Sequence, residues 1–187
     1  MRIRRKLMEL ENELAIARSP VLAYFLNGLQ REYIISLFQQ NSLSPPDELV
    51  DLYEWKNGVQ FEGVPTGLLH FGVPGVFFPL EDSLKIFHAS EVTRSSTYFP
   101  VFSDDSFLIQ LNNRSPDYGK IFIYSPALQI FEPEACFDSL ESMIDTFIVC
   151  FRKGAFFYNN DSFFEQDYDK SFDVAKAVNP GSTYWSE

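Results

Sequence analysis

The sequence predicts a single α+β domain, in which a mostly antiparallel, twisted sheet of five or six strands is flanked by N-terminal and C-terminal helices. Helical spacing of apolar residues dominates the chain up to residue 58 and returns after residue 138. The region between them alternates short apolar runs with polar turns, a pattern typical of strands. With 187 residues, the chain is long enough to bury one sizeable core without disulfides or a bound metal.

Residues 1–18 are expected to form an amphipathic helix. Apolar side chains recur at alternating steps of four and three residues, at Ile3, Leu7, Leu10, Leu14 and Ala17. This stripe is shorter than the roughly three or four heptads that indicate a coiled coil, so packing onto the chain's own body is favoured over dimerisation. We therefore expect a monomer or a weak dimer, with residues 1–28 as a helical extension of a domain formed by residues 29–187.

A second helical stretch is predicted from Ser19-Pro20 to Gln40. Its apolar face would consist of Leu22, Phe25, Leu29, Tyr33, Leu37 and Phe38. The turn-forming pair Asn27-Gly28 would divide this stretch. In that case residues 30–40 form the first helix of the domain, and the part before it belongs to the extension.

Residues 44–58 are predicted to form one short helix with a signal at each end. Ser44 can cap the start, Pro45 suits the first helical turn, and Asp47 stands at the capping-box position. The pair Asn57-Gly58 supplies the left-handed residue that ends such a helix. The expected face consists of Leu49, Leu52, Tyr53 and Lys56.

Beyond residue 58, glycines and prolines alternate with single apolar residues, which predicts short strands and turns up to residue 75. After a break at Pro79, residues 80–87 are expected to form a short helix or turn. The later strands follow one another through short polar turns, which predicts an antiparallel meander. Strands are expected at residues 76–78, 99–102, 107–111, 120–124 and 129–132.

Asp138 is expected to cap a helix that ends at Gly154 and covers the sheet. Its apolar stripe comprises Leu140, Met143, Ile144, Phe147, Ile148 and Phe151. The tail, residues 155–187, has seven Phe or Tyr side chains between Phe156 and Phe172, and it carries six acids against two lysines. Because large aromatic side chains bury much apolar area, we expect the tail to be ordered and docked on the domain, with a helical turn or two over residues 174–178.

The net charge of −11 argues against a general nucleic-acid binder, because such proteins neutralise phosphates with Lys and Arg. The first 20 residues carry five Lys or Arg and three Asp or Glu, a net charge of +2, which leaves −13 for the remainder. A basic protein partner fits this charge better, although acidity also serves solubility alone.

The longest apolar run, residues 21–26, is too short to span a bilayer. The basic start, residues 1–6, is followed by acids where a signal peptide needs apolar residues, so we expect a cytoplasmic protein with no membrane partner. The two cysteines, Cys136 and Cys150, fit neither a disulfide framework nor a metal site. Reduced thiols, and no metal or cofactor, are the expectation.

We do not expect an enzyme. His70 and His88 are not accompanied by a nucleophile or a second metal ligand, and the sequence has none of the GxSxG, HExxH or phosphate-loop motifs. The adjacent acids Glu81-Asp82 and Asp104-Asp105 are not placed as paired catalytic carboxylates, since neighbours on a strand point to opposite faces. Each pair would form either a solvated loop or a contact with a basic partner, and these four residues are the candidate contacts.

The segment 44–58 resembles the opening signature of the SUKH superfamily, the domain of fungal Smi/Knr cell-wall-synthesis regulators and of many bacterial toxin-immunity proteins. The matching residues are Pro46, Leu52, Tyr53, Trp55, Asn57 and Gly58. The usual Leu-Pro entry is here Leu43-Ser44-Pro45-Pro46, so the register of the first turn can shift by one residue. Later segments similar to the family, in its order, are residues 78–81, 99–102, the strand led by Gly119, 139–141 and 179–185.

The resemblance implies a non-catalytic binding protein that neutralises a cognate basic protein toxin, such as a nuclease, by occlusion. An intracellular scaffold of the Smi/Knr type is the alternative, and a toxin gene directly upstream would favour the immunity role. An enzyme is a third hypothesis, and it would need a convergent polar site that two histidines do not provide. For Trp55, Asn57 and Gly58 themselves, the favoured interpretation is that they only pack and cap a helix.

Overall fold

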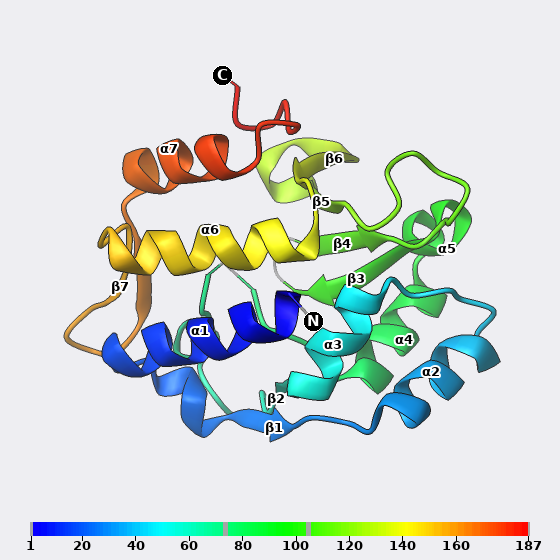
Figure 1. Cartoon of the computed structure of the whole chain (residues 1–187), viewed down its shortest axis with the longest axis horizontal. Coiled ribbons are helices and arrows are strands. Elements are labelled where there is room, and N and C mark those ends of the chain that lie inside the picture. Colours follow the sequence, from blue (N-terminus) through cyan, green and yellow to red (C-terminus); the bar gives the residue numbers. More distant parts are fainter. Residues whose placement is uncertain (1, 73–74, 104–105, 187) are drawn as a thin grey trace.

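The computed structural model describes residues 2–72, 75–103 and 106–186. Within these residues the chain forms seven α-helices and eight strands, with helices packed around antiparallel sheets (Figure 1). The predicted α+β class is therefore confirmed. None of the described helices is long and apolar enough to cross a membrane.

The largest sheet has four strands in the order β3-β4-β5-β6, each antiparallel to its neighbour. This order follows the chain, so the predicted meander is confirmed. The strands are β3 (Tyr98–Phe102), β4 (Ser106–Gln110), β5 (Ile121–Ser125) and β6 (Ile130–Phe137). Two further antiparallel pairs are β1 (Phe25–Asn27) with β2 (Lys56–Val59), and β7 (Phe156–Tyr158) with β8 (Phe164–Gln166).

The segment around Phe77 links the four-stranded sheet to the β1–β2 pair. Phe77 forms a β-bridge with Phe102 of β3, and its carbonyl accepts a hydrogen bond from the N–H of Val59 at 3.0 Å. In place of the strand expected over residues 76–78, the structure has this single bridge. Backbone pairing nevertheless continues from β1 to β6.

The helix expected at the N-terminus is α1 (Arg2–Ile16), which packs against α3 (Asp47–Trp55) and α6 (Leu140–Arg152). Its buried side chains belong to the same core as the sheet; they are Ile3, Leu7, Leu10 and Leu14. Figure 1 shows α6 lying between α1 and α7 (Tyr168–Val178). The expectation that this helix packs on the chain's own body is confirmed.

The stretch from Ser19 to Gln40 is helical mainly in its second half. Residues Pro20–Ala23 form a short 3₁₀ helix, β1 follows, and α2 covers Arg31–Gln40. The division at Asn27-Gly28 is thus confirmed, and the α-helix expected before it is wrong. A Cβ atom at Gly28 would lie 1.8 Å from the carbonyl oxygen of Glu54, so only glycine lets the chain pass this close to α3.

The helix α3 begins at Asp47, so the predicted cap at Ser44 and the capping box at Asp47 are wrong. Ser44 and Pro45 each precede a proline, whose ring disfavours helical dihedrals at the residue before it. At the other end, the residue after the helix is already extended. Gly58 has a positive φ of 74°, as expected, but it lies inside β2 and does not cap α3.

The segment expected as a helix or turn is α4 (Leu80–Ala89), a full helix. A further helix, α5 (Glu91–Ser96), is absent from the prediction, because its polar sequence lacks an apolar period. Ser90 accepts the hydrogen bond at its start, and Thr97 ends it in a left-handed conformation with φ of 59°. These local signals alone mark the helix.

The helix α6 starts with a capping box formed by Ser139 and Ser142, one residue after the predicted cap at Asp138. The Asp138 carboxylate instead accepts a hydrogen bond from the N–H of Gly181 at 3.1 Å. The helix is followed by Gly154 in a left-handed conformation, as expected. It packs against β6, α1 and α7, so its apolar stripe covers more than the sheet.

The tail is ordered, as expected. It forms the β7–β8 pair and α7, which extends well beyond the predicted turn over residues 174–178. Val174 and Ala175 are each 2% exposed, and α7 contacts α6. The tail is therefore packed on the domain.

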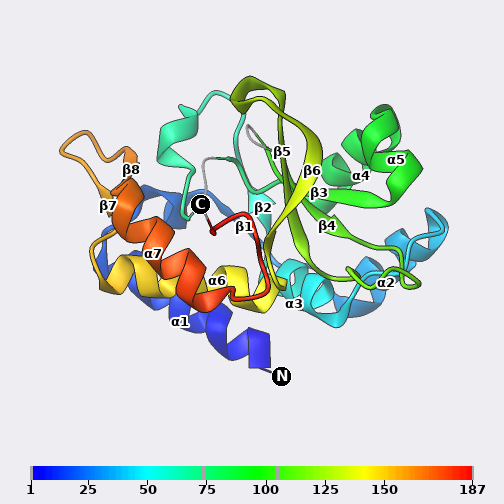
Figure 2. The same ribbon diagram turned by 90° about the horizontal axis from the view of Figure 1, so that it is seen from above.

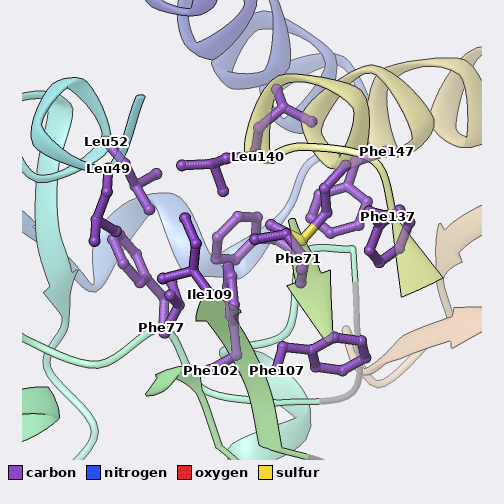
Figure 3. Close-up of a cluster of buried hydrophobic side chains, with 14 of the residues drawn as sticks. Leu49, Leu52, Phe71, Phe77, Phe102, Phe107, Ile109, Phe137, Leu140 and Phe147 are labelled. Carbon is purple, nitrogen blue, oxygen red and sulfur yellow. The ribbon is translucent and has the colours of Figure 1, made fainter. Parts of the chain in front are cut away.

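Side chains from distant parts of the chain meet in one core (Figure 3). Leu49 comes from α3, Phe102 from β3 and Phe147 from α6. Phe71, which is 1% exposed, makes edge contacts with the rings of Phe77 and Phe147 at centroid distances of 6.3 and 6.4 Å. The elements that carry the candidate sites described below are all anchored in this core.

Candidate functional site

The predicted acidic contacts are only partly described by the structure. Glu81 and Asp82 lie in the first turn of α4, a position that acidic side chains favour, and both are half-buried. Asp82 pairs with Lys85 at 2.7 Å, and Glu81 accepts a hydrogen bond from the hydroxyl of Tyr33 at 3.3 Å. Asp104 and Asp105 lie outside the described residues. The Glu81-Asp82 pair is thus engaged with its own chain.

The signature residues join α3 to its neighbours. Leu52 and Tyr53 are fully buried, and the Tyr53 hydroxyl lies 3.1 Å from the Ser83 hydroxyl of α4. Pro46 directly precedes α3. Trp55 is half-buried and donates a hydrogen bond from Nε1 to Glu11 of α1 at 2.8 Å. These contacts give the residues a packing role.

Asn57 and Gly58 act at the start of α4. The side-chain oxygen of Asn57 accepts a hydrogen bond from the N–H of Leu80 at 2.9 Å, which caps α4 and not α3. A Cβ atom at Gly58 would lie 2.3 Å from the nitrogen of Pro79 and 2.4 Å from the carbonyl carbon of Phe78. This geometry agrees with the interpretation that these residues pack and cap a helix. The helix that Asn57 caps is α4, whereas the expected one was α3.

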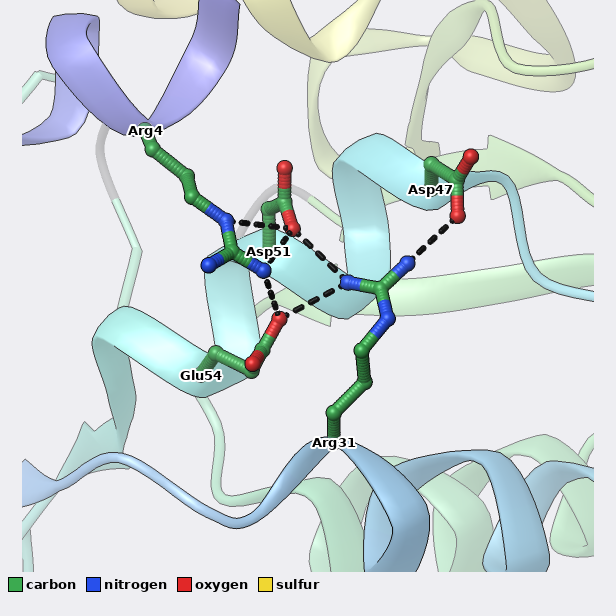
Figure 4. Close-up of polar contacts among 5 residues, drawn as sticks. All are labelled: Arg4, Arg31, Asp47, Asp51 and Glu54. Carbon is green, nitrogen blue, oxygen red and sulfur yellow. Dashed lines mark hydrogen bonds and ion pairs between the residues drawn. The ribbon is translucent and has the colours of Figure 1, made fainter. Parts of the chain in front are cut away.

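A cluster of charged residues connects α1, α2 and α3 (Figure 4). Asp51, which is 5% exposed, accepts hydrogen bonds from Arg4 Nε and Arg31 Nη1, both at 2.9 Å. Arg31 also pairs with Glu54 at 2.8 Å and with Asp47 at 2.6 Å. Burial favours a raised pKa for Asp51, but the two guanidinium groups outweigh it and lower the pKa. The charges satisfy one another, so the cluster fits a structural role.

The part of the chain that the structure describes forms no metal centre, and both of its cysteines are buried. Among the described residues, no group of three or more His, Cys, Asp or Glu could hold a metal ion. Cys136 and Cys150 are buried free thiols, and burial raises the pKa of Cys150 to about 12. His88 lies 2.6 Å from the amide oxygen of Asn41 at an exposed position. The thiols are therefore protonated and poor nucleophiles.

A groove of about 960 Å³ lies between the sheet, α6, α7 and the C-terminal segment; we call it the aromatic groove. Apart from Gly72, its lining residues come from the second half of the chain. They are Gly72, Phe107, Ile123, Leu128, Phe137, Thr146, Phe147, Phe156, Gln166, Tyr168, Asp169, Ser171, Phe172, Asp173, Ala175, Tyr184 and Trp185. Figure 2 shows the C-terminal segment passing between α7 and β6.

The floor of the aromatic groove is made of interlocked rings. Phe147 of α6 packs against Phe137 of β6 at a centroid distance of 6.3 Å and an interplanar angle of 89°. It also packs against Phe156 of β7 at 6.1 Å. Each of these rings is at most 5% exposed, and Figure 3 shows Phe137 and Phe147 side by side. Edge-to-face packing of this kind makes a rigid apolar surface.

The C-terminal segment forms one wall of the groove. The ring of Trp185 contacts Phe172 of α7 at 5.8 Å and Phe137 at 5.6 Å. Its Nε1 donates a hydrogen bond to the carbonyl of Cys136, and Ser182 donates one to the carbonyl of Ala135 at 2.8 Å. These hydrogen bonds tie the wall to the outer edge of β6.

The rim of the groove is acidic. Asp169 and Asp173, four residues apart on α7, both line the groove and make no ion pair with a described residue. Tyr168 and Leu128 at the mouth are 74% and 58% exposed. No Lys, Arg or His stands among the described lining residues. Two negative charges therefore border an apolar floor that no described basic residue lines.

The sequence prediction missed this groove. The tail was expected to dock through its aromatic residues, but a helix was expected only from residue 174, after both aspartates. The spacing of Asp169, Phe172 and Asp173 on one helical face is the signal that would have pointed to it. The other lining residues lie far apart in sequence.

No protein-family model matches the chain, and a search of curated proteins found no match.

Proposed function

We propose that this chain is a non-catalytic binding protein that neutralises a basic protein partner by occlusion, the role that its resemblance to SUKH immunity proteins implies. One observation carries the proposal: β6 and the β7–β8–α7 unit present exposed aromatic side chains beside carboxylates that form no ion pair within the described residues. The aromatic residues are Phe131, Phe157, Phe163 and Tyr168, and the acids are Glu132, Glu134, Asp161, Asp169 and Asp173.

Exposed aromatic residues favour this reading because they are enriched in protein interfaces. Phe131 and Tyr168 are 70% and 74% exposed, which is unusual for side chains that bury readily. The acids supply charge complementarity to a basic partner and would repel an acidic one. Together they favour a partner that is both basic and partly apolar.

Many of the basic side chains that the structure describes pair with acids of the same chain. Among the side chains that the structure describes, eight Lys and Arg residues make ion pairs with acids of the same chain: Arg4, Lys6, Arg31, Lys56, Lys85, Lys120, Arg152 and Lys170. Pairing within the chain does not change the net charge of −11, which gives the molecule a negative field toward other molecules. A field of this kind raises encounter rates with a cationic partner by about 10- to 1,000-fold at low salt.

Co-expression with a basic toxin domain encoded beside this gene tests the proposal. We expect restored growth of the host cells, a complex that purifies intact, and an association rate that falls steeply as salt is added. The same toxin expressed with an acidic protein of unrelated fold is the control for charge alone.

Three outcomes would contradict all or part of the proposal. Absence of a complex with any neighbouring toxin domain would remove the immunity role. A complex that leaves the toxin active would favour the scaffold alternative. Association that does not depend on salt would contradict the electrostatic part.

A further inference from the structure

The size and shape of the aromatic groove suit part of a protein partner. At about 960 Å³ it lies at the upper end of the range of ligand pockets, about 300–1,000 Å³. It is large enough for a few side chains and too small for a folded domain. An inserted segment, anchored by one or two side chains, matches this volume.

The chemistry of the groove selects a cation next to an apolar group. The floor of Phe137, Phe147 and Phe156 offers no polar atom, so it favours an aliphatic or aromatic side chain. Tyr184 and Trp185 also line the groove, and aromatic rings of this kind can make cation–π contacts. A nucleic acid, an anionic lipid surface or an acidic peptide would instead meet uncompensated negative charge at the rim.

The two aspartates point to more than one cationic group. Residues four apart on one helix face, such as Asp169 and Asp173, lie about 5–6 Å apart at Cβ, and like charges at this spacing destabilise a helix slightly. Phe172 lies between them in the lining. A segment with Lys or Arg on both sides of an apolar residue can pair with both carboxylates while its apolar side chain reaches the floor. A small amine with one charge can satisfy only one of them.

We infer that the aromatic groove is the binding site for a basic segment of a protein partner, in which Lys or Arg residues flank a leucine or aromatic residue. The inference rests on the proposed function and deepens it: Asp169 and Asp173 hold the cationic groups, and the floor holds the apolar side chain between them. The Tyr184–Trp185 wall closes the site on the β6 side.

A peptide titration tests the inference without the natural partner. In a Trp55→Phe background, Trp185 is the remaining tryptophan, so its fluorescence reports on the groove. The probe is the peptide acetyl-Lys-Arg-Leu-Lys-Arg-amide, compared with the same peptide carrying Glu at the four basic positions. We expect a saturable change with the basic peptide and none with the acidic one.

Variants of the rim and the probe separate the two parts of the site. Asp169→Asn combined with Asp173→Asn should weaken binding at least ten-fold, whereas Glu32→Gln combined with Glu91→Gln removes two exposed charges outside the groove and should change it less than two-fold. Replacing the leucine of the peptide by serine should weaken binding at least five-fold. An unchanged melting temperature of both double variants shows that folding is intact.

Equal affinity of the two double variants would overturn the site assignment. If the serine peptide bound as tightly as the leucine peptide, binding would depend on charge alone, and the role of the apolar floor would be overturned. Spermidine binding as tightly as the peptide would assign the groove to a small organic cation, and dimerisation lost in the Asp169→Asn, Asp173→Asn variant would assign it to a second copy of the chain.

The natural partner distinguishes failure of this inference from failure of the proposed function. If a neighbouring toxin is neutralised equally well by the rim variant, the function stands and the groove assignment is wrong. If the peptide binds as expected but no toxin is neutralised, the groove stands and the immunity role is wrong.

Discussion

At the scale of single residues, Asn57 and Gly58 are placed by their contacts with the segment before α4. The side chain of Asn57 accepts a hydrogen bond from the N–H of Leu80, the first residue of α4. The first N–H groups of a helix have no carbonyl partner within the helix, so Asn57 supplies the missing acceptor. Gly58 lets β2 approach the backbone of Phe78 and Pro79 more closely than any side chain permits. The pair therefore fixes where α4 begins relative to α3.

Gly58→Val should destabilise the fold by more than the roughly 1–2 kcal/mol that a left-handed conformation costs a residue with a side chain, because the added atoms also clash with backbone. Gly63→Val is the matched control, since Gly63 has nearly the same φ, 75°, with nothing within 4 Å of its Cβ position. Urea unfolding of both variants measures the difference. Equal losses would show that the close approach has no energetic weight.

The two cysteines should be unreactive in the folded protein. Burial raises the pKa of both thiols, to about 12 for Cys150, so the reactive thiolate is scarce at pH 8. With Ellman's reagent at that pH, we expect negligible release of chromophore from the native chain and two equivalents after unfolding in guanidinium chloride. Fast reaction of one native thiol would place it in an accessible position.

At the scale of elements, the cluster of charged residues links the three helices α1, α2 and α3. Asp51 of α3 is shared by Arg4 of α1 and Arg31 of α2 (Figure 4). Ion pairs at the surface contribute little, because water screens them and flexible side chains lose entropy. Asp51 differs because this residue is buried, at 5% exposed. Loss of its carboxylate would deprive two guanidinium groups of a hydrogen-bond acceptor.

Asp51→Asn should lower the free energy of unfolding at pH 7 by about 1.5–3 kcal/mol, the range for hydrogen bonds to charged groups. Asp47→Asn is the control, since the Asp47 side chain is 89% exposed and its pair with Arg31 should contribute less than about 1 kcal/mol. Chemical denaturation of each variant measures both values. Equal effects would mean that burial does not strengthen the cluster.

The contribution of Asp51 should depend on pH. Its pKa in the folded chain is below the ordinary value of 3.8, so its stabilisation is complete above that value and is lost as pH falls through the folded pKa. The stability difference between the wild type and Asp51→Asn should therefore shrink in acid. A difference that stays constant down to pH 2 would contradict the lowered pKa.

At the scale of the whole molecule, α6 is the element on which the C-terminal third depends. It contacts α1 on one side, α7 on the other and β6 beneath, while the C-terminal segment crosses back to β6 (Figures 1 and 2). The edge of β6 is covered there by Ser182 and Trp185 and carries Pro133 farther along the strand. Proline and exposed charge on an edge strand oppose pairing with another chain.

Truncation after Gly154 should remove β7, β8, α7 and the C-terminal wall, and expose Phe137 and Phe147. Burying a large apolar side chain contributes about 1.5–3 kcal/mol, so we expect a lower melting temperature and a smaller soluble fraction. A chain ending after Trp185 is the control and should behave as the wild type. Sharp, narrowly dispersed NMR signals from the tail of the intact chain would instead indicate a mobile segment.

The sequence by itself determined the fold class, the amphipathic helix at the N-terminus, the helices over residues 31–40 and 140–152, and the meander. Each follows from side-chain periodicity within a short window, where backbone geometry alone decides which residues share a face. The same windows also located the left-handed glycines Gly58 and Gly154 correctly.

Only the tertiary structure decided which distant residue or helix each of these side chains contacts. Asn57 caps a helix that begins 23 residues later, and Asp51 pairs with an arginine 47 residues earlier. The aromatic groove joins residues from Gly72 to Trp185, and no single segment contains enough of them to be recognised. Such contacts depend on how helices and sheet pack around a shared core, and packing is set by the whole chain at once, not by local spacing.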